Sequence, residues 1–472
     1  MTPRLQRLLA SPAGSMMVAL LAFLAVFQLF HHVVTPTFVF FIAGLLVLGI
    51  MARPEYGLHL LVFVSVVSLA QYFQLPTLGP VSLPFAMVGA LLLAFLIHLS
   101  LLRKKLYLNI AENWLICAFS LLVVFSMLMA RHLGPENLSS FRRHYLLVIV
   151  VYFFIIQFIE RRAAFLRLIG TLVAADLALV LSGILDYVGL LESTKSSALL
   201  EGRTVGFIGD PNELAFTLIG LSSLVVALVL HVRGRWARMA LLVLAGANLF
   251  IILNTLSRGG FVSLVAVAVT MAFRVSHDRR IIALLLVLAL VAYLLLPAQL
   301  FERFDKIQSL RGTSRWVLAV TGARMALAHP LLGVGYGNFG RESPRYDPYY
   351  HRGGTSAHNL YVSIASQIGL PALLLWLVLV WVAWWRVSAL FHAFSREGER
   401  FLMLLAVALQ ANLVNLLVFG LSIHVEYTYM TFITLALIIL ADRLYRSRTV
   451  PAARTAPAPG PAAGLAGGGL SS

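Results

Sequence analysis

Long apolar segments recur along almost the whole chain, and this pattern limits the fold more than any other feature of the sequence. A membrane-spanning helix needs about 20 predominantly apolar residues. Candidate spans lie near 16–32, 37–51, 56–75, 82–102, 113–130, 144–159, 165–190, 214–232, 236–254, 259–273, 281–297, 360–385, 401–420 and 427–444. Because the first two are short, the pattern predicts about 12–14 transmembrane helices.

The composition also favours a membrane protein. Charged residues make up 12% of the 472 residues and hydrophobic residues 60%, with a mean hydropathy of +0.90. A soluble domain carries about 25% charged residues. The lone cysteine, Cys117, excludes a disulfide within the chain and a cysteine metal site. We therefore predict an all-α polytopic membrane protein.

The net charge of +17 would suggest a nucleic-acid partner for a soluble protein. In a membrane protein, the distribution of this charge first indicates how the chain is oriented across the membrane. Assigning alternate connections to the cytoplasm, beginning with the amino terminus, gives those connections 22 of the 36 Lys and Arg residues, as the positive-inside rule requires. The apolar stretch from Met16 lacks a convincing cleavage site, so we expect it to be a retained span. Both termini are thus predicted in the cytoplasm, with membrane lipids and no nucleic acid as partners.

One long outer connection organises the chain. We expect transmembrane helices with short loops over 1–297, a large outer loop over 298–358, C-terminal transmembrane helices over 359–446, and a disordered cytoplasmic tail over 447–472. Within the outer loop, Thr313 or Ser314 can cap a helix that ends at His329 and Pro330. An ordered insertion of this length on one face indicates a function.

Four arginines lie outside, close to span ends, where topology does not explain them: Arg142, Arg143, Arg203 and Arg258. Each could simply extend its guanidinium to water or lipid headgroups. Guanidinium is, however, the side chain suited to bidentate binding of phosphate. Four such groups on one face favour a phosphorylated lipid of the outer leaflet as the ligand.

Two of these arginines stand in segments that carry further signals. Arg203 precedes GFIGDPNELA, in which Asp210 can cap a helix and Glu213 can complete a capping box. A helix amino terminus beside an arginine is a natural anion site. Arg258 stands in NTLSRGGF, whose glycines permit the close approach of a ligand, or only of a neighbouring helix.

His358 stands in AHNLYVSIASQIGLPALL, where the outer loop meets the next span. Histidine can accept a proton near neutral pH, although a lone histidine at an interface is often only structural. Its place beside the large outer loop and the outer arginines makes it a candidate catalytic base. Asn359 and Tyr361 either contribute hydrogen bonds there or cap and anchor the helix.

Other signals are weaker. Gly333, Gly335 and Gly337 resemble a phosphate loop but follow no strand, which argues against nucleotide binding. Asp176 lies within a span without an evident basic partner and is thin evidence for an ion path. No histidine set or acidic pair suits a metal ion, so we expect no metal and no cofactor.

Four segments between Gly202 and Leu374 resemble the O-antigen ligase and O-antigen polymerase superfamily of bacterial envelope glycosyltransferases. They are GRTVGFIGDPNELA, NTLSRGGF, SRWVLAVTGARMALAHPLLGVGYGNF and AHNLYVSIASQIGLPALL. The pair HPLLGVGYGNF and AHNLY is the specific signal, whereas SRGG alone is weak. The resemblance implies a GT-C-like membrane-embedded glycosyltransferase of the bacterial inner membrane, with helices in a large periplasmic loop and the active site facing the periplasm.

The resemblance also implies a reaction: transfer of a glycan from undecaprenyl diphosphate, with inversion and without a metal. Arg203 and Arg258 would bind the diphosphate and His358 would be the catalytic base, with Arg142, Arg143 and Arg324 as possible further contributors. The acceptor is the lipid A core oligosaccharide in ligases and another lipid-linked repeat unit in polymerases. We favour the ligase because the outer loop has eight Lys or Arg residues, which suit a phosphorylated core.

Two alternatives remain open. One is an O-antigen polymerase of the same superfamily. The other is a transporter or flippase for a lipid-linked substrate, which predicts functional charges deep in several spans and often an internal repeat. Asp176 is nearly alone within the spans and no repeat is evident, so the enzyme is the better interpretation.

Overall fold

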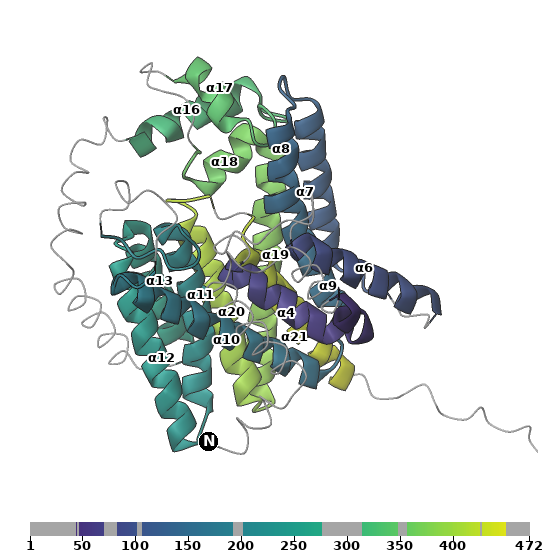
Figure 1. Ribbon diagram of the computed structural model, residues 1–472, viewed down its shortest axis with the longest axis vertical. Coiled ribbons are helices and arrows are strands. Elements are labelled where there is room, and N and C mark those ends of the chain that lie inside the picture. The colour runs from purple at the N-terminus through teal and green to yellow at the C-terminus, as the bar shows by residue number, and fades with distance from the viewer. Residues whose placement is uncertain are drawn as a thin grey trace, which may run out of the picture.

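The computed structural model describes residues 44, 47–69, 83–101, 106–191, 202–275, 314–347, 356–424 and 427–449. These residues form helices and connecting turns, with no β-strand among them (Figure 1). The predicted all-α polytopic membrane fold is confirmed. The predicted spans near 16–32 and 281–297, most of that near 37–51, the loop segment 298–313 and the tail beyond residue 449 lie outside the described residues.

Within the described part of the chain, eight helices are long and apolar enough to cross a membrane. They are α7 (Ala111–Leu128), the continuous run of α8 (Pro135–Ser140), η1 (Phe141–Leu146) and α9 (Leu147–Phe158), then α10 (Arg162–Tyr187), α11 (Pro211–His231), α12 (Arg235–Asn254), α13 (Arg258–Val275), α19 (Leu370–Arg396) and α20 (Arg400–Phe419). α4 (Pro54–Val67) is a shorter apolar helix, as is most of α6 (Leu83–Leu101). α21 (Tyr429–Thr449) occupies the last predicted span.

The predicted span near 360–385 is wrong in its first part, because two helices share it. The short helix α18 (Leu360–Gln367) ends before Gly369, and α19 begins at Leu370. Gly369 has φ of 105°, a conformation that strongly favours glycine. The carbonyl oxygen of Leu331 would lie 2.2 Å from a Cβ at this position. Apolar composition runs through this break, so hydropathy alone cannot detect it.

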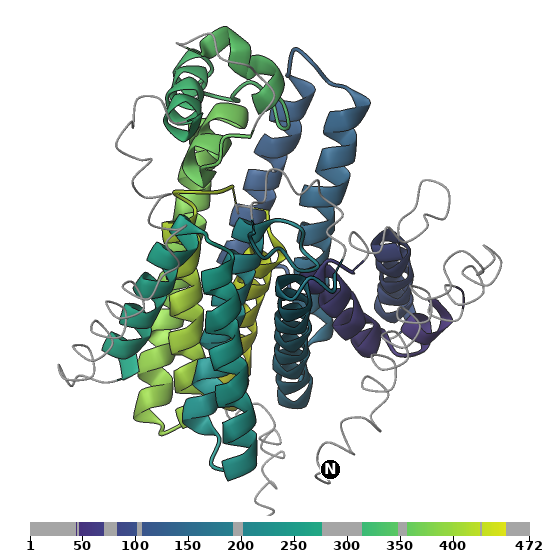
Figure 2. The same ribbon diagram turned by 60° about the vertical axis from the view of Figure 1, so that its left-hand side comes forward.

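The long helices pack around α20. It contacts α11, α13, α19 and α21, while α7 packs against α19 and α9 packs against α21 and α4. Large side chains such as Phe154, Phe165, Trp376 and Phe419 are fully buried between these helices. The bundle has an upper and a lower end in Figures 1 and 2, and at the upper end α7 and the run from α8 to α9 reach higher than α11, α12 and α13.

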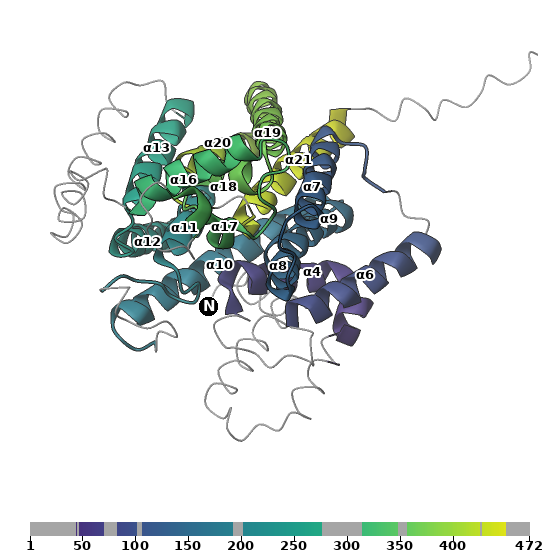
Figure 3. The ribbon, with the colours of Figure 1, turned by 90° about the horizontal axis from the view of Figure 1, so that it is seen from above.

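Three short helices lie together at the upper end: α16 (Ser314–Ala328), α17 (Phe339–Tyr346) and α18. α16 packs on both α17 and α18, and Figure 3 shows the three from above, over α11 and α20. α16 begins at Ser314, as its capping signal predicted, and ends just before His329 and Pro330. These helices cover the end of the bundle at which the candidate site lies.

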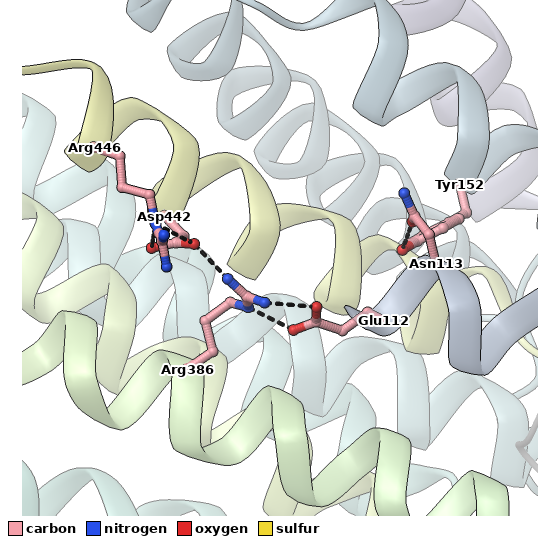
Figure 4. Close-up of polar contacts among 6 residues, drawn as sticks. All are labelled: Glu112, Asn113, Tyr152, Arg386, Asp442 and Arg446. Carbon is pink, nitrogen blue, oxygen red and sulfur yellow. Dashed lines mark hydrogen bonds and ion pairs between the residues drawn. The ribbon is translucent and has the colours of Figure 1, made fainter. Parts of the chain in front are cut away.

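A network of charged residues joins three helices at the opposite level (Figure 4). Arg386 of α19 donates from Nε and a terminal nitrogen to the two oxygens of Glu112 on α7, over 2.5 and 2.8 Å, and also pairs with Asp442 of α21. Arg446 donates to both oxygens of Asp442 at 3.0 Å. Glu112 is only 1% exposed. The network therefore fixes the relative heights of α7, α19 and α21.

Candidate functional site

The segment around Arg203 is tied to two helices by its backbone. The amides of Val205 and Gly206 donate to Asp186 Oδ2 over 2.6 and 3.1 Å, and the amide of Thr204 donates to the carbonyl of Asn254 over 3.1 Å. Gly206 has φ of 50°, and a Cβ there would approach the Ser182 hydroxyl to 2.7 Å. The GRTVG sequence is therefore shaped to lie against the ends of α10 and α12.

The Arg203 side chain joins the two arginine-containing motifs. Its Nε donates to the carbonyl oxygen of Thr255 over 2.8 Å, and a terminal nitrogen donates to Asn212 Oδ1 over 3.2 Å. Asn212 Oδ1 also accepts from the Ser257 hydroxyl at 2.9 Å. The first turn of α11 and the NTLSRGGF segment thus orient this guanidinium together.

Arg258 begins α13 directly after a turn. Leu256 adopts φ of 49°, one of three non-glycine residues in the left-handed region among those described. The Ser257 hydroxyl accepts from the amide of Gly260 at 3.1 Å, in the manner of a helix cap. A Cβ on Gly259 would lie 2.0 Å from the Ser422 hydroxyl. The glycines therefore bring Arg258 close to the 420–424 turn after α20.

Asp210 caps α11, as its sequence context predicted. Its Oδ1 accepts from the amides of Asn212 and Glu213 over 2.9 and 3.0 Å. The start of this helix therefore lies beside Arg203, which contacts Asn212. A helix amino terminus carries a partial positive charge, so the arginine and the helix favour an anion at the same place.

His358 stands at a sharp turn immediately before α18, with φ of 47°. Such a conformation costs of order 1–3 kcal/mol for a non-glycine residue and persists where the surroundings impose it. Asn359 imposes it from one side, because its side chain accepts from the amide of Val362 at 3.0 Å and donates to the carbonyl of Leu421 at 3.1 Å. The Tyr361 hydroxyl donates to the carbonyl of Leu417 over 2.7 Å. Asn359 and Tyr361 thus cap and anchor α18, the second of the two roles considered for them.

Two residues that the sequence analysis did not single out join this region. Arg315 of α16 is half-buried, and its pKa is lowered by burial and by the positive charge of Arg258. The ring of His424 lies 5.9 Å from that of His358, measured between centroids. Desolvation and the nearby His358 lower the pKa of His424, although its side chain is exposed at the surface of the protein.

The electrostatic environment keeps His358 in its neutral form. Burial and the positive charge of Arg315 lower its pKa below the usual value, and the Asp210 carboxylate opposes this shift. A neutral imidazole can accept a proton, whereas an imidazolium cannot. Arg258, Arg315, His358 and His424 therefore share one region with Asp210, with a base beside several cations.

The other candidate arginines lie differently. Arg142 and Arg143 are exposed in η1, where Arg142 lies over the Phe85 ring at 5.3 Å and Arg143 donates to the Ser139 hydroxyl at 2.5 Å. The neighbouring His144 contributes to the electrostatics of His424, so η1 borders the site. Arg324 is exposed on α16. Because nine residues of an α-helix make two and a half turns, it projects from the side opposite Arg315.

The three glycines that resemble a phosphate loop build a packed turn instead. Gly333, Gly335 and Gly337 have φ between 63° and 99°, and added Cβ atoms would approach Gln367, Ala130 and Asn137 respectively. The amides of Gly335 and Gly337 donate to the backbone and side-chain oxygens of Gln367, over 3.0 and 2.9 Å. The glycines allow this turn to join α16 and α17 to α18 and α7.

Asp176, the acidic residue within a span, accepts a hydrogen bond from the Asn248 side chain at 2.7 Å. It therefore belongs to the contact between α10 and α12. In the described residues, no group of three or more His, Cys, Asp or Glu side chains is arranged to hold a metal ion.

A signal for Arg315 and His424 was present in the sequence but weak. Arg315 opens the amphipathic segment SRWVLAV, and His424 lies in the last outer connection, SIHVEYTY. Neither position stands out without knowing which segments meet. Asn212 was not singled out, because the segment that contains it was interpreted only through the capping residues Asp210 and Glu213.

Comparison with known families supports the resemblance seen in the sequence. Residues 243–377 match the family model described as O-antigen ligase. This segment is therefore similar to the O-antigen ligase family. Members of this family are glycosyltransferase-like enzymes, and the family implies lipid-linked polysaccharide substrates. A comparison with curated proteins finds no match. The matched segment includes Arg258, Arg315 and His358, whereas Arg203 and His424 lie outside it.

Proposed function

We propose that the chain is an O-antigen ligase that transfers O-antigen polysaccharide from undecaprenyl diphosphate to the lipid A core oligosaccharide. One observation carries the proposal. Arg203, Arg258, Arg315 and His358 come from separate segments and meet at one end of the bundle, in and beside the segment that is similar to the O-antigen ligase family. This is the combination that a diphosphate leaving group and a hydroxyl nucleophile require.

In this proposal the enzyme lies in the bacterial inner membrane with both termini in the cytoplasm and the site facing the periplasm. The positive-inside assignment supports this orientation. Connections assigned to the cytoplasm also meet one another at the end opposite the site: Arg162 pairs with Glu399 at 3.7 Å, and Arg400 donates to the carbonyl of Leu230 at 3.0 Å.

Arg203 and Arg258 hold the diphosphate of the donor, and Arg315 adds a third cation. Negative charge grows on the diphosphate as the bond between sugar C1 and the phosphate oxygen breaks. Positively charged donors that are already in position stabilise this charge more in the transition state than in the bound donor. The hydrogen bonds from Arg203 to Thr255 and Asn212 supply that positioning.

His358 accepts the proton of the attacking hydroxyl. The acceptor oxygen forms a bond to C1 on the face opposite the diphosphate, and undecaprenyl diphosphate leaves with the electron pair of the broken bond. A single displacement of this kind inverts the anomeric configuration. Because burial and Arg315 lower the pKa of His358, the base is in its neutral form at neutral pH.

Purified protein tests this function. We expect transfer from an undecaprenyl-diphosphate-linked polysaccharide to lipid A core in detergent, in the presence of a chelator, with inversion at C1. Extension of the lipid-linked donor itself, without attachment to lipid A core, would identify a polymerase. Movement of the donor across a proteoliposome membrane without bond formation would identify a transporter. Dependence on an added divalent cation would remove the metal-independent mechanism.

A further inference from the structure

α16 carries apolar side chains on two opposite faces. One face packs inward, with Val317, Thr321 and Met325 at 8%, 1% and 0% exposure. The other face contains Trp316, Val320, Ala323 and Leu327, with Trp316 48% and Leu327 77% exposed. These exposed side chains form an apolar patch, and a contiguous exposed apolar patch indicates contact with a membrane or with another protein. We therefore expect the outer face of α16, defined by these four residues, to lie in an apolar environment.

This face continues into the lipid-facing side of a candidate span. The amide of Leu370, the first residue of α19, donates to the carbonyl of Pro330 over 2.8 Å, so Leu331 lies at the start of α19. Leu331 is 71% exposed. From there an exposed apolar stripe runs along one side of α19, formed by Leu370, Leu374, Leu377, Trp381 and Trp385. Spacings of three and four residues place these side chains on a single face.

The position of the charged network allows the depth of residues along α19 in the membrane to be estimated. Arg386 pairs with Glu112 and Asp442, and Trp385 beside it has the exposure expected of an aromatic residue at a membrane interface. Leu370 lies sixteen residues before Arg386, a rise of about 24 Å along an α-helix. The hydrocarbon core of a bilayer is about 30 Å thick, and tilt can only reduce the height of Leu370. We place Arg386 at the inner edge of the hydrocarbon core, and on that assignment Leu370 and Leu331 lie within the hydrocarbon.

The helix α13 gives a second indication of how far the site lies from the level of Arg386. Arg274, near the end of α13, lies over the rings of Trp384 and Phe391 at 5.9 and 5.3 Å, close to the level of Arg386. Arg258 is sixteen residues earlier, again about 24 Å along the helix. Gly259 lies against Ser422, the amide of Leu360 donates to the carbonyl of Gly420, and the ring of Tyr361 lies against that of Trp376. The start of α13 is therefore about level with Trp376, below the start of α19.

We propose that α16 is an interfacial helix whose outer face lies among the acyl chains of the leaflet at the site end of the molecule. Its inner side presents Arg315 to the site, and Arg324 flanks the apolar face, from which its long side chain can reach the headgroups. An amphipathic contact of this kind is held by buried apolar area and by attraction to anionic lipids. The inference rests on the membrane-spanning position of α19 and is independent of the reaction that the site catalyses.

Collision of spin labels with oxygen and with a nickel chelate distinguishes the environments. In a Cys117→Ser background, single nitroxide labels are placed at Leu327, at Leu374 on the lipid-facing side of α19, and at the exposed Arg341 of α17. The labelled proteins are reconstituted in phosphatidylethanolamine–phosphatidylglycerol vesicles. Oxygen concentrates in the acyl chains and the chelate in water. We expect the label at Leu327 to match that at Leu374, with collisions shifted from nickel to oxygen relative to Arg341.

Either of two results would overturn the inference. If the Leu327 label collides with nickel as often as the Arg341 label does, the outer face of α16 lies in water. If it collides with neither reagent, protein covers this face. Donor transfer by the Cys117→Ser background, measured separately, tests the proposed function, so failure of one proposal does not resemble failure of the other.

Discussion

The two ends of the helix bundle use arginine in different ways. At one end, Arg386 donates to the carboxylates of Glu112 and Asp442, which oppose its charge. At the other end, Arg203 donates to a backbone carbonyl and to a side-chain amide oxygen. These two contacts orient the Arg203 guanidinium between the first turn of α11 and the NTLSRGGF segment. The first arrangement holds three helices together, and the second positions a guanidinium beside a helix amino terminus, where we propose that the diphosphate binds.

The largest expected effect belongs to the histidine at the site end. Replacing His358 with alanine removes the proposed base, and loss of a general base costs about 10²- to 10⁴-fold in rate. Transfer is measured with purified protein, and thermal unfolding in detergent should match that of the wild type. Near-normal transfer by His358→Ala would exclude the histidine from catalysis. Only the proposed binding of an anion by the arginines would then remain for this end of the bundle.

At the opposite end, Glu112→Ala should act on stability. Removing one partner of a buried ion pair costs about 3–5 kcal/mol, since Arg386 loses its bidentate acceptor. Chemical or thermal unfolding in detergent measures this, and transfer per folded molecule should be unchanged. A variant of normal stability that has lost transfer would mean that this network takes part in the reaction. The arginines at the two ends of the bundle would then not differ in role as we propose.

Arg203→Ala should lower the rate of transfer by about 10²- to 10³-fold, the usual effect of losing one positioned donor to developing negative charge. Arg235→Ala is the matched control, because Arg235 opens α12 at the opposite level and stacks near Trp236 at 5.6 Å. Transfer rates at saturating acceptor provide the measurement. Equal losses in both variants would point to a general requirement for positive charge.

Arg315 should set the pH at which the base works. Because its positive charge lowers the pKa of His358, transfer by the wild type should persist below the usual pKa of histidine, about 6.5, and fall only as His358 becomes protonated. Arg315→Met removes the charge, so the acidic limb of the kcat/KM profile should move to higher pH. Arg324→Met, on the opposite side of α16, should leave the limb in place. A limb that moves in both variants, or in neither, would contradict the assignment.

Smaller effects are expected from the residues that orient Arg203. Ser257→Ala removes the hydroxyl that shares Asn212 Oδ1, and a net hydrogen bond is worth about 0.5–1.5 kcal/mol. We expect a loss of transfer of several-fold at most, with a loss of stability of about 0.5–2 kcal/mol because Ser257 also caps α13. Asn212→Asp should raise the KM for the donor, because a carboxylate opposes the charge of Arg203. A lowered KM in that variant would argue against diphosphate binding by Arg203.

Much of the site was visible in the sequence because its residues sit in strong local contexts. Capping of α11 by Asp210 and the start of α16 at Ser314 follow from side-chain chemistry within a few positions. The break at Gly369 was missed, since its cause is the carbonyl of Leu331 on a distant turn. Arg315 and His424 were missed for the same reason: their meeting with Arg258 and His358 depends on packing between segments.

The sequence by itself determined the membrane fold, the two arginine motifs, the histidine and the similarity of the segment 243–377 to the O-antigen ligase family. These follow from composition, periodicity and short-range hydrogen bonding, which act over one or two helical turns. Only the tertiary structure decided that the two arginine motifs share Asn212, that Arg315 lies near Arg258 and His358, and that Asn359 and Tyr361 anchor α18 to the end of α20. Those relations are made by contacts between residues far apart in the chain, and no local pattern records them.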